Sequence, residues 1–208
     1  MFDSDKPDVY EKVYQELLPR MAGADLASVS QALGLERKGD SVMIPCLGRR
    51  YLVGAGGVKA KDGERVLITH RIVLAYYLLH GGRGEASGRF VPYRELPGGQ
   101  DFARSLSQIV EAPLAQGFSG RLKDLNKAAA SLGGSKPETE INADAVFTFE
   151  ALPKLPLMLT FYDADEDFPA EAKVFYDLTA PNFLDMECLA ALGHMLALEL
   201  GAAAKPSG

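Results

Sequence analysis

The spacing of apolar residues along the chain predicts six helices. In the first, Val9, Val13 and Leu17 recur at the spacing of one helical face. The stretch from His70 to His80 is apolar nearly all round, and a helix without a polar face normally lies at the centre of a core. The predicted helices cover residues 5–19, 25–33, 70–80, 100–116, 120–132 and 182–200, with Asp5, Thr69 and Asn182 as N-caps and Gly34 as a C-cap.

Shorter apolar runs, several of them alternating with polar residues, predict two groups of β-strands. The first group begins at Val42 and includes a hairpin across Asp62-Gly63, a two-residue turn signal between Val58 and residues 66–68. The second group covers residues 146–152, 157–162 and 173–177, with a short edge strand at 90–93. Because the strands follow one another through short turns, we expect an α+β fold with mostly antiparallel sheet. An N-terminal meander and C-terminal hairpin strands would pack with helices, one of them buried and central.

The length of 208 residues corresponds to one domain. At this size folding buries roughly 70% of the surface of the unfolded chain, so a hydrophobic core can stabilise the fold without disulfides or metals. We expect a single domain over residues 1–208. Glycine, serine and proline predict a flexible connector at 133–140, and a short disordered tail is expected at 202–208.

The composition argues against several classes of protein. Cys46 and Cys188 are far apart and belong to no CxxC motif, which argues against a zinc site or a four-cysteine iron–sulfur cluster made by this chain. The polar start, MFDSDKPD, is not a secretory signal, and no apolar run approaches the roughly 20 residues of a membrane-spanning helix. We therefore expect a cytoplasmic protein without a membrane partner. The net charge of −6 argues against nucleic acid as the partner.

A long glycine-rich segment, residues 81–99, contains the candidate ligand-binding residues. Residues 1–100 carry 14 basic and 12 acidic side chains, so an anion-binding surface is expected in this half of the chain. Loops of this length are uncommon and often functional, and arginine binds carboxylate or phosphate bidentately. The candidates are Arg83, Arg89, Tyr93, Arg94 and Glu95. In the alternative interpretation, the charged residues pair with their neighbours and the aromatic residues pack on the core.

Carboxylates are concentrated in a turn at residues 163–167, DADED, which matches the first three ligand positions of a calcium loop. Phe168 and Val174 stand where the turn glycine and the bidentate glutamate belong, so the sequence excludes an EF-hand. A Mg²⁺ or Ca²⁺ site remains open if Asp177 or Glu171 folds back towards the turn. The candidate metal ligands are Asp163, Asp165, Asp167 and Asp177. The alternative is a solvated loop, since runs of like charge usually remain in contact with water. The sequence requires no cofactor.

Three segments carry a resemblance to a known family: THRIVLAYYLLHGG (69–82), RFVPYRELPGGQDF (89–102) and FPAEAKVFYDLTAPNFLDMECLAALG (168–193). Their order and spacing resemble an uncharacterised family of bacterial and archaeal proteins, the domain-of-unknown-function family numbered 3786, over most of the chain. The resemblance implies an anaerobic source. In some relatives it implies a cysteine-rich iron–sulfur segment ahead of this domain, which is not present in this chain. It implies no activity and no catalytic residue.

These observations leave three functional hypotheses. The first is a non-catalytic domain that binds a small anionic ligand or a partner protein, because the sequence contains no GxSxG elbow and its three histidines are scattered. The second is a metal-assisted hydrolase or transferase for an anionic substrate, which requires the acidic turn and the arginines to converge in space. The third is an accessory protein for corrinoid or iron–sulfur chemistry, and it rests on the family resemblance alone.

Overall fold

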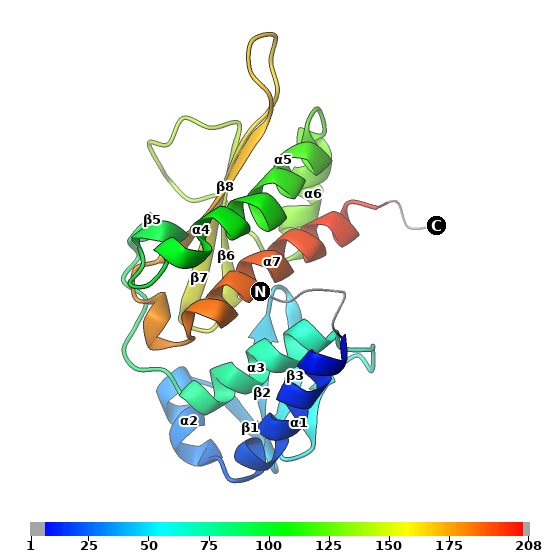
Figure 1. The fold of residues 1–208 in the computed structure, drawn as a ribbon, viewed down its shortest axis with the longest axis vertical. Helices are drawn as coiled ribbons and strands as arrows, with labels where there is room; N and C mark the ends of the chain where they lie inside the picture. The colour runs from blue at the N-terminus through cyan, green and yellow to red at the C-terminus, as the bar shows by residue number, and fades with distance from the viewer. Residues whose placement is uncertain (1–6, 206–208) are drawn as a thin grey trace.

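Two antiparallel sheets of four strands form the frame of the fold in the computed structural model, which describes residues 7–205 (Figure 1). The strand order is β1-β2-β3-β4 in the first sheet and β5-β8-β7-β6 in the second. The strands are β1 (Glu36–Lys38), β2 (Ser41–Cys46), β3 (Arg49–Gly54), β4 (Gly57–Ala60), β5 (Phe90–Pro92), β6 (Ala145–Leu152), β7 (Leu155–Tyr162) and β8 (Glu171–Asp177). The predicted α+β class with mostly antiparallel sheet is confirmed.

Helices pack on both sheets, and two of them, α3 and α7, pack on each other between the two halves of the molecule (Figure 1). A π-helical turn, η2, joins α4 to α5 into one long helical segment. The helices and helical turns are α1 (Pro7–Ala22), α2 (Leu26–Leu33), α3 (Ile68–His80), η1 (Tyr93–Glu95), α4 (Gln100–Leu106), η2 (Ser107–Glu111), α5 (Ala112–Phe118), α6 (Leu122–Ser131), η3 (Ala180–Asn182) and α7 (Met186–Ala203).

The predicted central helix is confirmed as α3, which buries His70 and six apolar residues. α7 is buried to a similar degree, and Leu189, Leu192 and Leu196 contribute nothing to the molecular surface. By length and apolar composition alone, α7 is also the one helix of the described chain that could cross a membrane, and the expectation of no membrane partner stays a prediction. Half of this 18-residue helix is buried inside the fold, as in the core helix of a globular protein.

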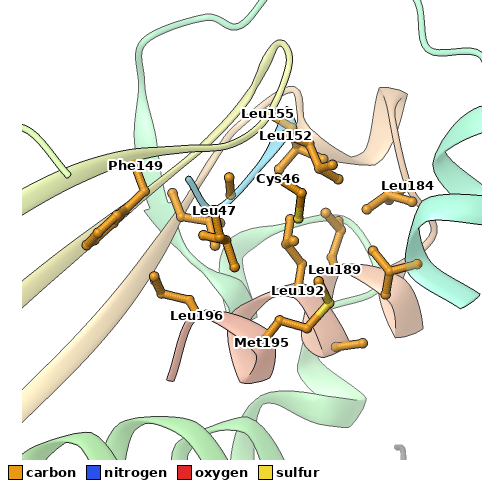
Figure 2. Close-up of a cluster of buried hydrophobic side chains, with 14 of the residues drawn as sticks. Cys46, Leu47, Phe149, Leu152, Leu155, Leu184, Leu189, Leu192, Met195 and Leu196 are labelled. Atoms are coloured by element: carbon orange, nitrogen blue, oxygen red, sulfur yellow. The ribbon is translucent and has the colours of Figure 1, made fainter. Parts of the chain in front are cut away.

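One hydrophobic cluster joins the two sheets (Figure 2). Leu47 enters it from the turn after β2, Leu152 and Leu155 enter from the β6–β7 hairpin, and Met195 enters from α7. The backbone also connects the sheets, because the Leu47 N–H donates to the carbonyl of Ala151 at 3.2 Å. Burying one such leucine contributes about 2 kcal/mol, so each sheet depends on the other for part of its stability. The single domain over residues 1–208 stays a prediction.

The hairpin predicted across Asp62-Gly63 is wrong. The tight hairpin lies earlier, where Gly54 pairs with Gly57 at the ends of β3 and β4, and no strand forms at residues 66–68. Gly54 has no room for a side chain, because a Cβ there would lie 2.1 Å from the carbonyl oxygen of Asp40. The Asp62 carboxylate instead accepts the Glu64 N–H at 3.0 Å, which turns the chain away from the sheet and towards α3.

Several predicted helix ends differ by a few residues from the structure. α1 continues past Pro19 to Ala22, α3 begins at Ile68 with no side-chain cap in place of Thr69, and α7 begins after Asp185 and not at Asn182. The Asp185 carboxylate accepts the Cys188 N–H at 2.8 Å, so it satisfies a donor that Asn182 would be too early to reach. The Gly34 C-cap of α2 is as predicted, whereas the predicted Asp5 cap lies outside the described residues.

The predicted connector and tail are more ordered than expected at two positions. Ser135 forms an isolated bridge to Thr148 in which its N–H and carbonyl each make a backbone hydrogen bond, of 2.9 and 2.8 Å. α7 extends to Ala203, so residues 202 and 203 are helical. Residues 206–208 of the predicted tail lie outside the described residues.

Candidate functional site

Asp177 organises the glycine-rich segment between α3 and β5. Its carboxylate is fully buried and accepts five hydrogen bonds from two segments. The bonds come from the Ser87 N–H and hydroxyl (both 3.0 Å), the Gly88 N–H (2.7 Å), and the Thr179 N–H and hydroxyl (2.9 and 2.6 Å). Burial alone would raise the pKa of Asp177, but these bonds lower it below its ordinary value. Asp177 is thus occupied as an anchor for the loop.

A lysine from the β6–β7 turn of the same sheet holds the loop at Glu85. Lys154, at the β6–β7 turn, donates to the carbonyl of Ala32 at 2.8 Å and pairs with Glu85. Lys154 also has a positive φ of 60°, within the tight turn between β6 and β7. The segment at residues 81–99 is therefore held at both Asp177 and Lys154, although it contains little regular structure.

The structure does not bring the five candidate ligand-binding residues together. Arg83 and Arg89 are exposed on the loop near Asp177. Tyr93 is buried, and its hydroxyl donates to the carbonyl of Met186 at 2.6 Å, so its role is to hold η1 against α7. Arg94 and Glu95 are both exposed. Arg94 lines a pocket that Arg83, Arg89 and Glu95 do not line.

This pocket, of about 400 Å³, lies between η1, the α4–η2 helix and β8. Three cationic side chains line it: Arg94, Arg104 and Lys173. Within the described chain, neither Arg94 nor Arg104 has an ion-pair partner. The remaining lining is the buried Tyr93, the Ser107 and Glu111 side chains, and apolar groups from Pro92, Ala103, Leu106 and Phe175. We call this the cationic pocket.

One side of the cationic pocket is held together by contacts between Glu111 and β8. The Glu111 carboxylate accepts the Val174 N–H at 3.3 Å and pairs with the Lys173 ammonium at 3.3 Å, so both of its oxygens are engaged. Burial alone would lower the pKa of Lys173, but Glu111 and the more exposed Glu171 raise it above its ordinary value, so the ammonium stays charged. The π-helical turn at Ser107–Glu111 aims Glu111 at β8, and such turns are frequent at functional sites.

Sequence reasoning found Arg94 and Tyr93 but missed Arg104, Ser107, Glu111 and Lys173. Arg104 and Ser107 look like ordinary exposed positions of an amphipathic helix, and Lys173 looks like the solvent-facing residue of an alternating strand. The helix and the strand are more than 60 residues apart in sequence, and the Lys173–Glu111 pair spans that separation. No local signal could have predicted the pocket.

In the acidic turn between β7 and β8, the aspartate carboxylates accept hydrogen bonds from backbone N–H groups. Asp165 accepts the N–H groups of Asp167 and Phe168, at 2.8 and 2.7 Å. Asp163 accepts the N–H of Gly120 at 2.7 Å, which fastens the turn to the end of α5. Its own N–H donates to Asp144 at 2.7 Å. These carboxylates are used as acceptors for backbone donors.

Strand β8 separates the acidic turn from Asp177 and from the arginines of the loop. The turn precedes Glu171 at one end of β8, and Asp177 is at the other, six residues and about 20 Å away. Asp177 therefore does not fold back towards Asp163, Asp165 and Asp167. Among the described residues, no group of three or more histidine, cysteine or acidic side chains is placed to hold a metal ion. The convergence that the metal-assisted enzyme hypothesis requires does not occur.

The cysteines are not arranged as nucleophiles. Both thiols are buried, and burial raises the pKa of Cys46 and of Cys188 far above the ordinary thiol value.

His70 is buried and pairs through Nε2 with Glu199 at 3.0 Å across the α3–α7 contact. This hydrogen bond lowers the pKa of Glu199 although burial opposes it. The pair joins the two halves of the fold.

Comparison with known proteins gives one result. No curated protein and no solved structure matches the chain. A family model described as a domain of unknown function, DUF3786, matches residues 25–199. The match runs from the cap of α2 to the last turn but one of α7, so it includes both sheets, the anchored loop and the cationic pocket. The chain therefore belongs to the DUF3786 family.

Proposed function

We propose that this protein binds a small anionic ligand in the cationic pocket without acting on it chemically. The observation that carries the proposal is the pair Arg94 and Arg104, two guanidinium groups that line one cavity and have no ion-pair partner among the described residues. Lys173 adds a third positive charge, and Glu111 is the single carboxylate in the lining. The lining has a net charge of +2, which a dianionic ligand would neutralise.

The remaining lining favours a ligand that also has an apolar part. Leu106 and Phe175 contribute apolar surface beside the guanidinium groups, and Ser107 contributes a hydroxyl. Hydrogen bonds to charged groups contribute about 1.5–3 kcal/mol each before the entropy of association is subtracted. Two arginine contacts contribute about 3–6 kcal/mol in total, so after the entropy of association is subtracted the expected Kd is about 1 mM or weaker.

The test is thermal stabilisation by small anions at constant ionic strength, with phosphate, succinate and phenyl phosphate as probes. We expect phenyl phosphate to raise the unfolding midpoint most, because it combines a dianion with an apolar ring. Arg94→Ala and Arg104→Ala should each reduce the affinity about tenfold, which corresponds to about 1.4 kcal/mol. Arg83→Ala is the matched control, since it removes the same charge from the same loop outside the pocket. Equal losses in all three variants would mean that net charge alone attracts the anion.

A partner protein is a second candidate, favoured by one observation on the acidic turn. Phe168 is 71% exposed there and is surrounded by carboxylates. An exposed aromatic ring within a negative surface fits a partner that offers an apolar pocket with a basic rim. Phe168→Ser should leave the unfolding midpoint unchanged and remove binding to such a partner. If Phe168→Ser lowers the midpoint by several degrees, the ring is part of the fold and this candidate fails.

The cellular setting stays a prediction. The cytoplasm of an anaerobic bacterium or archaeon, and a role beside corrinoid or iron–sulfur chemistry, are expectations drawn from composition and from the family resemblance. Co-purification of a defined redox protein with the chain from an anaerobic lysate would support the accessory role. A chain that is recovered alone would count against it.

A further inference from the structure

A second cavity, of about 750 Å³, lies between α5 and the C-terminal half of α7. It shares no lining residue with the cationic pocket, and its volume is within the range of small-molecule sites. Its walls are mostly apolar and are formed by Leu67, Ile109, Leu114, Phe118, Ala197 and Leu198. Leu67 and Leu198 are 53% and 45% exposed, so this part of the surface presents large apolar side chains to solvent. We call the cavity the α5–α7 groove.

Two helical glycines leave the groove open. Gly117 in α5 and Gly201 in α7 both line it, and a Cβ added to either would have nothing within 4 Å. Neither glycine has a positive φ, so neither is required by the backbone conformation. Glycine destabilises a helix relative to alanine. Neither backbone geometry nor close packing explains these two residues, whereas an occupant of the groove would.

The polar groups are gathered at one end of the groove. Arg121 spans that end, because it donates to the carbonyl of Gly117 on α5 at 3.1 Å and to the carbonyl of Ala204 after α7 at 3.4 Å. Its charge is already paired with the Asp124 carboxylate at 2.9 Å. Lys205 lies beside it with no ion-pair partner in the described part of the chain. Glu199 also lines the groove, but its carboxylate is paired with His70. The unpaired charge at this end is therefore positive.

His194 supplies a neutral polar group along the wall. Its Nδ1 is buried and has no hydrogen-bond partner among the described residues. Burial lowers the pKa of His194, so the imidazole is uncharged at neutral pH and adds no second cation to the groove.

We propose that the α5–α7 groove binds a small amphiphile that has a hydrocarbon body and a single carboxylate head. The hydrocarbon lies along the apolar walls over Gly117 and Gly201, and the carboxylate pairs with Lys205 beside Arg121. A head that is cationic would meet the unpaired Lys205 with the wrong sign, and a neutral head would lose the ion pair. This site is independent of the anion proposed for the cationic pocket.

Isothermal titration of the full chain with decanoate tests the proposal, with decanol and decylammonium as probes of the head group. Decanoate should bind at least tenfold more tightly than decylammonium. Gly117→Leu and Gly201→Leu should each weaken decanoate at least tenfold while the unfolding midpoint stays the same or rises, because leucine is the better helix former and has free space to occupy. Ala203→Leu is the matched control, since it adds the same side chain to an exposed position of α7 outside the groove. Lys205→Gln should reduce the preference for decanoate over decanol.

Three outcomes would overturn the proposal. Decanoate affinity that is unchanged in both glycine variants would place the binding elsewhere. Equal affinity for decanoate and decylammonium would show that only the apolar surface acts. A wild-type dimer that Gly117→Leu or Gly201→Leu converts to a monomer, measured by sedimentation, would mean that a second copy of the chain covers the groove.

Discussion

Replacing Asp177 by asparagine tests the conclusion that this carboxylate anchors the glycine-rich loop. Asparagine is nearly the same size, and its oxygen can still accept the bonds that Oδ1 accepts from Ser87 and Thr179. Its amide NH₂, however, would face the Gly88 N–H, which now donates to Oδ2 at 2.7 Å. Asp177→Asn therefore exchanges one short charge-assisted bond for two opposed donors.

The expected cost can be worked from these contacts. Losing a hydrogen bond to a charged group costs about 1.5–3 kcal/mol, and the four remaining bonds weaken because the acceptor is no longer charged. We expect a loss of about 2–4 kcal/mol in the free energy of unfolding. For a chain of this size that corresponds to a decrease of about 4–16 °C in the unfolding midpoint. Hydrogen exchange at the Ser87 and Gly88 amides should accelerate more than exchange in α7.

The pH dependence has a definite sign. The pKa of Asp177 is lowered in the folded protein, so its stabilising contribution is present above the pKa of an unfolded aspartate, about 3.9. The contribution is lost as the pH falls through the folded value. The difference in stability between the wild type and Asp177→Asn should therefore be constant from neutral pH down to about pH 4 and shrink below it.

Asp165→Asn is the matched control for this experiment. Asp165 also accepts two backbone N–H groups, at 2.8 and 2.7 Å, but it is exposed, so water can replace the lost acceptor. Its cost should remain below about 1 kcal/mol. If the two variants lose equal stability in chemical denaturation, burial is not what distinguishes the two carboxylates and the reasoning is wrong.

Three other substitutions test buried contacts, each by its unfolding free energy. Gly193→Ala should cost about 1–3 kcal/mol, because its Cβ would lie 2.1 Å from the Tyr176 hydroxyl, and Tyr176→Phe should recover part of that loss in the double variant. Additive effects would show that the two residues do not touch. Tyr77→Phe should cost about 1–3 kcal/mol, since it leaves the proline carbonyl of the β6–β7 turn without its buried donor, and a neutral effect would contradict that contact. Glu199→Gln should flatten the pH dependence of stability below about pH 4.3, because the hydrogen bond from His70 holds the pKa of Glu199 below its ordinary value, and an unchanged acid limb would refute this assignment.

Much of the fold could be predicted from local patterns. The strands of the second sheet, the buried helix α3 and the caps of α2 each have a signal within a few residues, because side-chain period and capping chemistry act over one or two turns of chain. Errors occurred where tertiary packing decided between local alternatives. The signal at Asp62-Gly63 is a real turn, but no strand follows it to pair with β4 and make it a hairpin.

The candidate sites show the same limit. The sequence determined which segments contain concentrated charge, because charge is a property of composition and is visible in residues 81–99 and 163–167. Only the tertiary structure decided that Asp177 belongs to the loop and not to the acidic turn, since β8 carries the two to opposite ends of a strand. It also decided that Arg94, Arg104 and Lys173 line one pocket, and that α5 and α7 enclose an open groove. Sites of this kind form from residues of separate elements, and their proximity arises from packing over long sequence distances, which no local pattern encodes.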